Sequence, residues 1–403
     1  MSAAATLAIE AMGNRGEGLA RHEGKTLFVA GALPGEVVSA RIEGQRGLLE
    51  RVETASPERI APFCPHFGAC GGCQVQHWDH AAYRAWKRGL AVTALERAGL
   101  AAQVNELIDA HGEGRRRATL HATREGAGFM ALRSHTIHPI EHCPILVPGL
   151  AGAPALARAM AGVLGPCDVA VTDTAMGPDV AVRIKGKPGF APRRLAEVAE
   201  RFSACRVAIN GEVALNYAAP TLAIGTADVP LPVGGFLQAT ARAEAVLAEL
   251  VLEGAQGAKA VADLFCGIGP FALRLAQRAP VHAADSDREA VAALDKGSRS
   301  GKRLKAITVE TRDLFADPLT RFELDRFDTV VLDPPRAGAP AQTKALAGAR
   351  KLERVLYVSC DPVSFARDAA VLVAAGFAMG PVTPVDQFAW SSHLELFCRF
   401  TRR

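Results

Sequence analysis

A cysteine near the C-terminal end of the chain has the sequence context of a nucleophile. Cys360 follows an apolar run, Val355 to Val358, and precedes Asp361-Pro362. We therefore expect a strand, a turn and then a helix, with the thiol at the mouth of a sheet. Free backbone N–H groups and the positive end of the helix dipole would favour the thiolate, which is the nucleophilic form. A lone cysteine is more often a small buried hydrophobe, so this assignment depends on the other motifs.

A glycine-rich turn indicates a nucleoside-like ligand. Residues 263–270 (DLFCGIGP) follow an apolar strand and precede a helix, and their glycines let a ligand approach the backbone. Asp285 ends the next strand, where its carboxylate can accept hydrogen bonds from ribose hydroxyls. The pattern also fits a dinucleotide fingerprint. Pro270 removes an N–H near the place where pyrophosphate would bind, which favours S-adenosylmethionine over NAD.

An Asp-Pro-Pro-Arg turn, Asp333 to Arg336, holds Asp333 rigidly at the sheet edge. An enzyme that methylates an exocyclic amine would have a tyrosine at this position, stacked on the target base. This chain has Arg336 there, so methyl transfer to a carbon atom fits better. C5 of a pyrimidine attacks a methyl group only after a thiolate adds to C6, and a base must then remove the C5 proton. Cys360 is the candidate nucleophile for a flipped-out pyrimidine. Glu395, at the start of an apolar strand that should raise its pKa, is the candidate base.

A second cluster contains cysteines with metal-ligand spacing. Cys64, Cys70 and Cys73 lie within ten residues and are interleaved with glycines, and Cys143 follows at a distance. Zinc is one metal that such a group binds. Closely spaced cysteines plus a distant one on a wrapped loop also suit an iron–sulphur cluster, and the spacing leaves the choice of metal open. Further candidate ligands are His66, His77, Cys167 and Cys205.

Three regions differ in their pattern of secondary structure. Residues 1–55 contain short β runs separated by glycine-rich turns, which predicts a small β-barrel of the oligonucleotide-binding kind. Residues 56–230 mix the cysteines, a helical stretch and β runs, which predicts an α+β domain that holds the metal cluster. In residues 231–403 strands and helices alternate, which predicts a Rossmann-like, doubly wound parallel sheet with ligands at the carboxyl ends of its strands. The expected fold class is α/β.

Size and composition limit the possible classes of protein. A chain of 403 residues is too long for one ordinary core, and 49% hydrophobic with 22% charged residues indicates a globular protein. The first twenty residues lack a sustained apolar run, and no stretch reaches the ~18 apolar residues that a membrane helix needs. Nine cysteines, an odd number, argue against a disulfide framework. We expect a cytoplasmic monomer, and the basic run Arg115 to Arg117 suggests contact with phosphate groups.

Together these motifs resemble those of the bacterial RNA uracil-C5 methyltransferases, in the branch that carries an iron–sulphur cluster and modifies large-subunit ribosomal RNA. Asn14 to Ala20 and Ala32 to Glu36 look like the family's N-terminal RNA-binding barrel, known as TRAM. The segments that match the family's donor site, nucleophile and base are 263–269, 333–338, 359–362 and 393–395. The resemblance covers nearly the whole chain and implies an RNA substrate and S-adenosylmethionine as the methyl donor.

The resemblance also implies two sets of ligands. The cysteines that would hold a 4Fe-4S cluster are Cys64, Cys70, Cys73 and Cys143. The residues that would line the donor site are Gln238, Phe265, Gly267, Asp285, Asp313 and Asp333. Thr240 stands where the family usually has asparagine, and Pro270 where a small or polar residue is usual, which affects the details of donor contact. The transfer-RNA branch lacks the cysteine cluster, so its presence favours ribosomal RNA.

Other functions predict different properties. A transfer-RNA uridine-C5 methyltransferase would share the chemistry but act on another RNA. A non-catalytic RNA-binding or ribosome-assembly protein would bind RNA without transferring a methyl group, but the intact Cys360, Asp333 and Glu395 argue against it. An NAD-linked oxidoreductase would bind nicotinamide and leaves Glu395 without a role. The sequence does not identify the target uridine.

Overall fold

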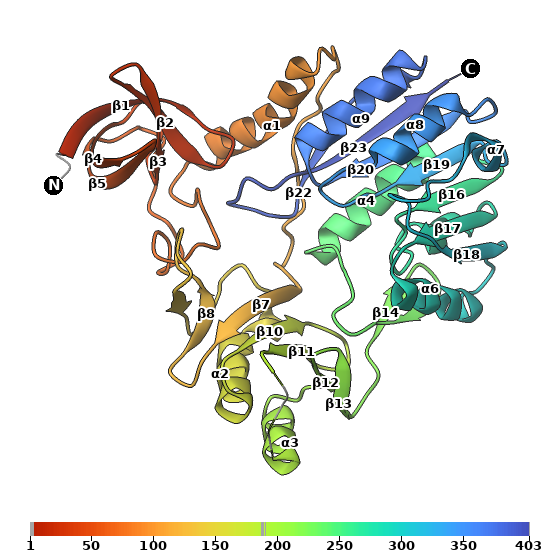
Figure 1. Ribbon diagram of the computed structural model, residues 1–403, viewed down its shortest axis with the longest axis horizontal. Helices are drawn as coiled ribbons and strands as arrows, with labels where there is room; N and C mark the ends of the chain where they lie inside the picture. The colour runs from red at the N-terminus through yellow and green to blue at the C-terminus, as the bar shows by residue number, and fades with distance from the viewer. Residues whose placement is uncertain (1–3, 187–188, 190, 403) are drawn as a thin grey trace.

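The N-terminal region is a closed five-stranded barrel in the computed structural model, which describes residues 4–186, 189 and 191–402 (Figure 1). Alternate residues such as Leu7, Ile9 and Val29 point inward, as the period of a strand requires. The strands pair in the order β1-β2-β3-β5-β4 and span Ala4–Met12 (β1), Glu17–His22 (β2), Lys25–Ala30 (β3), Val37–Glu43 (β4) and Arg46–Thr54 (β5). The predicted small β-barrel is confirmed.

The central region contains a seven-stranded sheet of order β13-β12-β11-β10-β7-β8-β9. Its strands are β7 (Arg117–Ala122), β8 (Ala127–Met130), β9 (Ile137–Pro139), β10 (Cys167–Thr172), β11 (Asp179–Ile184), β12 (Arg206–Ile209) and β13 (Glu212–Asn216). Helices α2 (Ala153–Leu164) and α3 (Pro192–Arg201) pack beside it, after the short 3₁₀ turn η1 (Pro148–Leu150). Leu156 and Met160 of α2 join Leu120 and Val169 of the sheet in one core.

The C-terminal region contains a nine-stranded sheet, in which β16, β17, β18, β19 and β20 are parallel and β23 runs antiparallel to β20. The strand order is β18-β17-β16-β19-β20-β23-β22-β6, with β21 on β23. The bounds are Ile108–Asp109 (β6), Val261–Leu264 (β16), Val281–Asp285 (β17), Ile307–Thr311 (β18), Thr329–Leu332 (β19), Arg354–Ser359 (β20), Ala378–Met379 (β21), Thr383–Asp386 (β22) and Glu395–Thr401 (β23). The order reverses between β16 and β19, which places ligands at the carboxyl ends of these strands.

Helices cover both faces of this sheet (Figure 1). Successive residues of β20 alternate between two cores, with Leu356 and Val358 on one face and Val355 and Tyr357 on the other. The helices are α4 (Ala241–Gly254), α5 (Ala272–Leu275) and α6 (Arg288–Ser300) on the first face, and α7 (Arg321–Leu324), α8 (Pro340–Gly348) and α9 (Pro362–Ala374) on the second. The predicted doubly wound α/β fold is confirmed.

Segments that precede the predicted C-terminal domain also pack on its sheet. Helix α1 (His80–Arg97) contacts α9, and Ala91 and Leu95 lie in the same core as Phe365. Strand β6 pairs in parallel with β22. The hairpin β14 (Thr221–Ile224) and β15 (Ala227–Pro230) packs on α6. These segments belong by sequence to the predicted central domain, residues 56–230, but they pack on the C-terminal sheet and its helices.

The loop between β22 and β23 joins the three regions. The backbone carbonyl of Trp390 accepts hydrogen bonds from the N–H groups of Gln74 (2.8 Å) and Val75 (3.2 Å), in the loop that carries three of the cysteines. Trp390 packs beside a small core that includes Leu33 of the barrel and Tyr83 of α1. Within the described part of the chain, no helix has the length and apolar character to cross a membrane.

Candidate active site

A cavity of about 460 Å³ opens where β16, β17, β19 and β20 end and β23 begins. Seven sequence-predicted residues line it: Gln238, Phe265, Gly267, Asp285, Asp333, Cys360 and Glu395. Asp313 is outside the lining, and its carboxylate accepts the backbone N–H groups of Phe315 (2.9 Å) and Ala316 (3.3 Å). Phe315 does line the cavity, so Asp313 acts on the cavity wall by holding the backbone of Phe315 in place.

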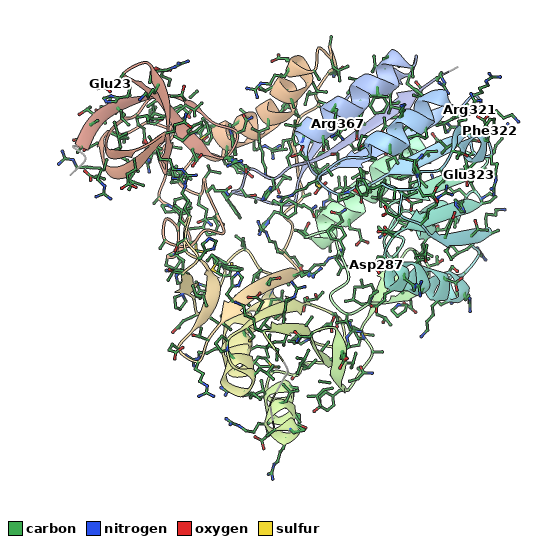
Figure 2. The ribbon with its side chains drawn as sticks, in the orientation of Figure 1. Glu23, Asp287, Arg321, Phe322, Glu323 and Arg367 are labelled. Carbon is green, nitrogen blue, oxygen red and sulfur yellow. The ribbon has the colours of Figure 1, made fainter. Side chains whose placement is uncertain are left out.

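The turn after β16 presents backbone to the cavity. Phe265 has φ +63° and Gly267 φ +52°, the left-handed region, so the chain reverses sharply there. The Gly267 N–H donates to Asp285 Oδ2 (2.8 Å), and the Asp287 N–H donates to Asp285 Oδ1 (2.9 Å). Asp287 caps α6 and lies at the inner edge of the C-terminal region (Figure 2). These bonds fix the Asp285 carboxylate at the cavity wall.

The cavity floor is acidic. Asp333 is held at the end of β19, and burial, followed by the charges of Glu395, Asp263 and Asp285, raises its pKa well above the usual range. Behind the lining, Asp263 is fully buried in β16, and burial raises its pKa to about 7. A site that accumulates carboxylates in low dielectric favours a positively charged ligand, since a nearby positive charge stabilises their ionised forms.

Cys360 directly follows β20 and precedes the helix cap formed by Asp361, whose carboxylate accepts the Ser364 N–H (2.8 Å). The predicted strand–turn–helix is therefore present. The expected stabilisation of the thiolate is wrong: burial, then the charges of Glu395 and Asp333, raises the pKa of Cys360 to about 12, and Arg336 opposes the shift only in part. The surroundings of Cys360 therefore favour the thiol over the thiolate.

Glu395 is the first residue of β23 and is buried, with 3% of its surface exposed. Burial raises the pKa of its carboxyl group to about 7, which agrees with the expectation for a base at the start of an apolar strand. Its Oε1 accepts a hydrogen bond from Gln387 Nε2 (2.9 Å). A carboxyl group with this pKa is present in both protonation states near neutral pH, as general acid–base catalysis requires.

Arg336 supplies a positive charge to the acidic cavity. Its Nη2 lies 3.2 Å from Nδ1 of His393, another lining residue. Burial, then the charges of Arg336 and Arg115, lowers the pKa of His393 to about 4, so this ring is neutral and can accept from the guanidinium. The charge of Arg336 also lowers the pKa values of Cys360 and Glu395.

The loop before α4 carries Gln238 to the cavity. Gln238 Oε1 accepts from Gln387 Nε2 (2.6 Å), and Gln238 Nε2 lies 3.4 Å from Asp333 Oδ2. Thr240 caps α4, because its Oγ1 accepts the Ala243 N–H (3.0 Å). The role of this threonine is therefore to start the helix. Gln387 was missed by sequence reasoning, because a single glutamine after a strand carries no motif of its own.

The four candidate metal ligands lie in irregular segments. Cys64, Cys70 and Cys73 are in the loop before α1, and Cys143 lies between β9 and η1. Burial raises the pKa of Cys143, and the charges of Cys64 and Cys70 raise it further, so these thiols are near neighbours. In residues 4–186, 189 and 191–402, however, no three Cys, His, Asp or Glu side chains converge closely enough to hold a metal ion. A central metal-cluster domain is therefore not shown.

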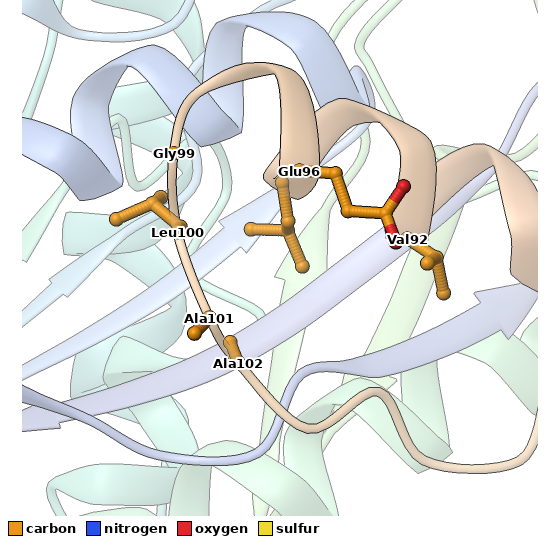
Figure 3. Close-up of a pocket in the computed structure, with 7 residues that line it drawn as sticks. Val92, Glu96, Gly99, Leu100, Ala101 and Ala102 are labelled. Carbon is orange, nitrogen blue, oxygen red and sulfur yellow. The ribbon is translucent and has the colours of Figure 1, made fainter.

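A second hollow, of about 420 Å³, lies at the C-terminal end of α1 (Figure 3). Its lining is apolar apart from Glu96 and backbone, and it includes Val92 and Leu100. None of the sequence-predicted site residues lies there. Apart from Glu96, the residues that line this hollow have no side chain that could act as a nucleophile, an acid or a base.

The fold and site define an S-adenosylmethionine-dependent methyltransferase preceded by a TRAM barrel, and comparison with known proteins identifies the family. A tRNA (uracil-5-)-methyltransferase family model matches residues 231–403, and a TRAM domain model matches residues 5–46. An RNA methyltransferase of Caulobacter vibrioides is 44% identical over 98% of this chain and 99% of the relative. The chain belongs to the RNA (uracil-C5)-methyltransferase family.

Two further proteins are similar over nearly their full length. The 23S rRNA (uracil(1939)-C(5))-methyltransferase RlmD of Shewanella frigidimarina is 30% identical over 99% of this chain and 96% of the relative. A tRNA (uracil-54, C5)-methyltransferase of Pyrococcus abyssi, solved with S-adenosyl-L-homocysteine, has a TM-score of 0.74 at 21% identity, covering 98% of this chain and 100% of that one. At this identity the second likeness establishes the fold.

Proposed function

We propose that this chain transfers the methyl group of S-adenosylmethionine to C5 of a uridine in large-subunit ribosomal RNA, through a covalent bond between Cys360 and C6. The observation that carries the proposal is the convergence of Cys360 and Glu395 on one cavity beside Gln238 and Asp333. A thiol nucleophile and a carboxyl group whose pKa is near 7 are the two groups that the reaction needs.

Each chemical step assigns a task to a residue. Cys360 loses its thiol proton to solvent and its Sγ forms a bond to C6, while the C5–C6 π pair moves to C5. C5 then takes up the electrophilic methyl group of the donor, and the electron pair of the broken S–CH3 bond leaves with S-adenosyl-L-homocysteine. Glu395 then accepts the C5 proton, the C5–C6 double bond reforms, and Cys360 is expelled. Because the pKa of Cys360 is raised to about 12, loss of the thiol proton must accompany substrate binding, and Arg336 is the positive charge that assists it.

The donor fits the residues of the cavity wall. Asp285, held by two backbone N–H groups, is placed to accept from ribose hydroxyls, and the turn of Phe265 and Gly267 lets an adenosyl group approach the backbone. Gln238 and Asp333 stand near the acidic floor, which suits a sulfonium. Asp313 contributes by fixing Phe315.

The RNA substrate is supported by the TRAM barrel and by the relatives. The similarity to RlmD favours 23S ribosomal RNA over transfer RNA. We also propose that Cys64, Cys70, Cys73 and Cys143 hold a 4Fe-4S cluster, with zinc as the alternative, because all four are free thiols and the charges of Cys64 and Cys70 reach Cys143. Binding would have to draw the four side chains together. The protein would act in the cytoplasm as a monomer.

Mass spectrometry of ribosomal and transfer RNA from a deletion strain tests this function. We expect one 5-methyluridine to disappear from large-subunit RNA and to return with the wild-type gene but not with Cys360→Ala. Loss of 5-methyluridine from transfer RNA alone would reassign the substrate. An unchanged set of modified uridines in both RNAs would refute the proposal.

A further inference from the structure

Gln387 lies between the base and the donor loop, at a position that neither the motifs nor the reaction scheme assigns. It follows β22 directly and is buried, with 1% of its surface exposed. Its Nε2 donates to Glu395 Oε1 (2.9 Å) and to Gln238 Oε1 (2.6 Å), and its Oε1 accepts the Ala239 N–H (2.7 Å). One amide therefore uses both of its protons and its carbonyl oxygen on the machinery of the site.

The orientation of this amide is determined by a backbone group. The Ala239 N–H can only donate, so the partner atom of Gln387 must be the carbonyl oxygen. The NH₂ group then has to face Gln238 and Glu395. Because Gln238 Oε1 accepts a hydrogen bond from Gln387, its own Nε2 is the atom that faces Asp333. A single backbone N–H thereby fixes the direction of two side-chain amides.

The same bond determines which oxygen of Glu395 acts. Oε1 accepts a hydrogen bond from Gln387. Within the described part of the chain, Oε2 has no hydrogen-bond partner. A proton on Oε1 would face the NH₂ protons of Gln387, so a proton arriving at Glu395 belongs on Oε2. Oε2 is thus the oxygen available to a substrate in the cavity.

The backbone that carries Gln387 is itself fixed. Asp386 binds Lys87 and Tyr83 of α1, and Lys87 is fully buried. Lys87 Nζ also donates to the carbonyl of Phe388 (2.9 Å). The residues on both sides of Gln387 are therefore held by α1, which keeps the amide in place without help from a ligand.

We propose that Gln387 is a positioning residue that couples the catalytic base to the donor loop: it directs the C5 proton to Oε2 of Glu395 and orients Gln238 toward Asp333. This inference rests on the proposed function. It predicts that loss of the Gln387 amide changes two measurable properties together, the affinity for the donor and the pH dependence of turnover.

Several charged or titratable groups surround Glu395 and share in that pH dependence. They come from the loop after β19, from the end of β20, from α1 and from the loop before β23, and they are Asp333, Arg336, Cys360, Lys87 and His393. A variant of Gln387 leaves all of them in place. A change in the pH profile of such a variant therefore reports the lost hydrogen bond.

The test uses Gln387→Met in the full-length protein, with Gln342→Met as a matched control. Gln342 is also a fully buried glutamine, but its amide bonds to the backbone of Leu319, away from the cavity. We expect Gln387→Met to weaken S-adenosyl-L-homocysteine binding in calorimetry by about threefold to tenfold, the value of one hydrogen bond. Its acid limb of kcat should move up by about one pH unit, because the lost bond favoured the ionised carboxylate.

Gln387→Glu provides a second variant of nearly the same shape, in case the methionine variant does not fold. It removes the NH₂ donor and adds an acidic group, so the acid limb should move further up than in Gln387→Met. Gln342→Met should leave both properties at wild-type values. Unchanged donor affinity and an unchanged pH profile in a folded Gln387 variant would overturn the inference, whereas a wild-type protein that methylates no RNA would refute the proposed function and leave the calorimetry to decide the role of Gln387.

Discussion

The catalytic cavity and the cysteine loop were both expected from short motifs, but the fold supports them differently. Cys360, Asp333 and Glu395 stand at the ends of paired strands, whose register fixes their separation. Cys64, Cys70 and Cys73 lie on a loop held by isolated backbone bonds, such as Gly71 N–H to the Met130 carbonyl (3.0 Å). A sheet can thus place catalytic groups by itself, whereas the cysteine loop would gain a defined geometry only from the metal that we propose it binds.

The largest effect expected in the cavity is from Cys360→Ala. Without the thiol no bond to C6 forms and C5 is never activated, so methyl transfer should be undetectable. Transfer of labelled methyl groups to ribosomal RNA measures this. Cys398→Ala is the matched control, because Cys398 is buried in β23 and does not line the cavity. Residual methylation of uridine by Cys360→Ala would show that the strand ends do not carry the nucleophile.

The cysteine loop should respond to loss of metal through stability. Protein prepared without oxygen should contain about four irons per chain, and Cys70→Ala should lose iron and unfold at a lower temperature. Iron analysis and thermal unfolding measure both. Cys167→Ala, in β10, should retain iron, because that cysteine lies in the central sheet. Stoichiometric zinc without iron would identify the other metal, and absence of any metal would refute the cluster.

The pH dependence of turnover should depend on the cavity rather than on the loop. Glu395 accepts a proton only when ionised, and its pKa is raised to about 7. When proton removal limits turnover, kcat should therefore fall about tenfold per unit as the pH decreases below 7. A pH–rate profile measures this. A limb near pH 4.5, the ordinary range for glutamate, would mean that burial does not tune this group.

The smallest effect is expected from the start of α4. Thr240 Oγ1 accepts the Ala243 N–H and donates to the Ala110 carbonyl (2.6 Å), so Thr240→Ala should cost about 1–2 kcal/mol of unfolding free energy. Chemical denaturation measures this cost. Thr240→Ser keeps the hydroxyl and should retain nearly all of the stability. An equally large loss of unfolding free energy in Thr240→Ser would show that the threonine methyl group, and not its hydroxyl hydrogen bonds, stabilises the protein.

Local patterns were enough to predict the barrel, the α/β alternation and most of the cavity. Each of these depends on a few consecutive residues, as at Cys360, where a strand ends and a helix begins. Properties that depend on distant contacts were not predictable. The pKa of Cys360 is raised because Glu395 and Asp333 approach it in space, and Gln387 is informative only because Ala239 lies opposite.

The boundary of the central domain and the role of Asp313 also depend on contacts that the sequence does not reveal. Helix α1 and strand β6 pair with elements almost 300 residues away, between Lys87 and Asp386 for example, and no local signal reports such contacts. Asp313 matches the family's pattern by position, but its carboxylate is used on its own turn. A residue can therefore match a family motif in the sequence and still not contact the cavity that the motif predicts.

The most direct test of the account uses Glu395→Gln with ribosomal RNA and S-adenosylmethionine. Loss of the base should slow turnover by about two to four orders of magnitude. The protein should accumulate as an adduct that survives denaturing electrophoresis, and mass spectrometry after nuclease digestion should find 5-methyl-5,6-dihydrouridylate joined through C6 to Cys360. Normal turnover of Glu395→Gln, or a nucleotide attached to any other residue, would contradict the assignment of Cys360 and Glu395.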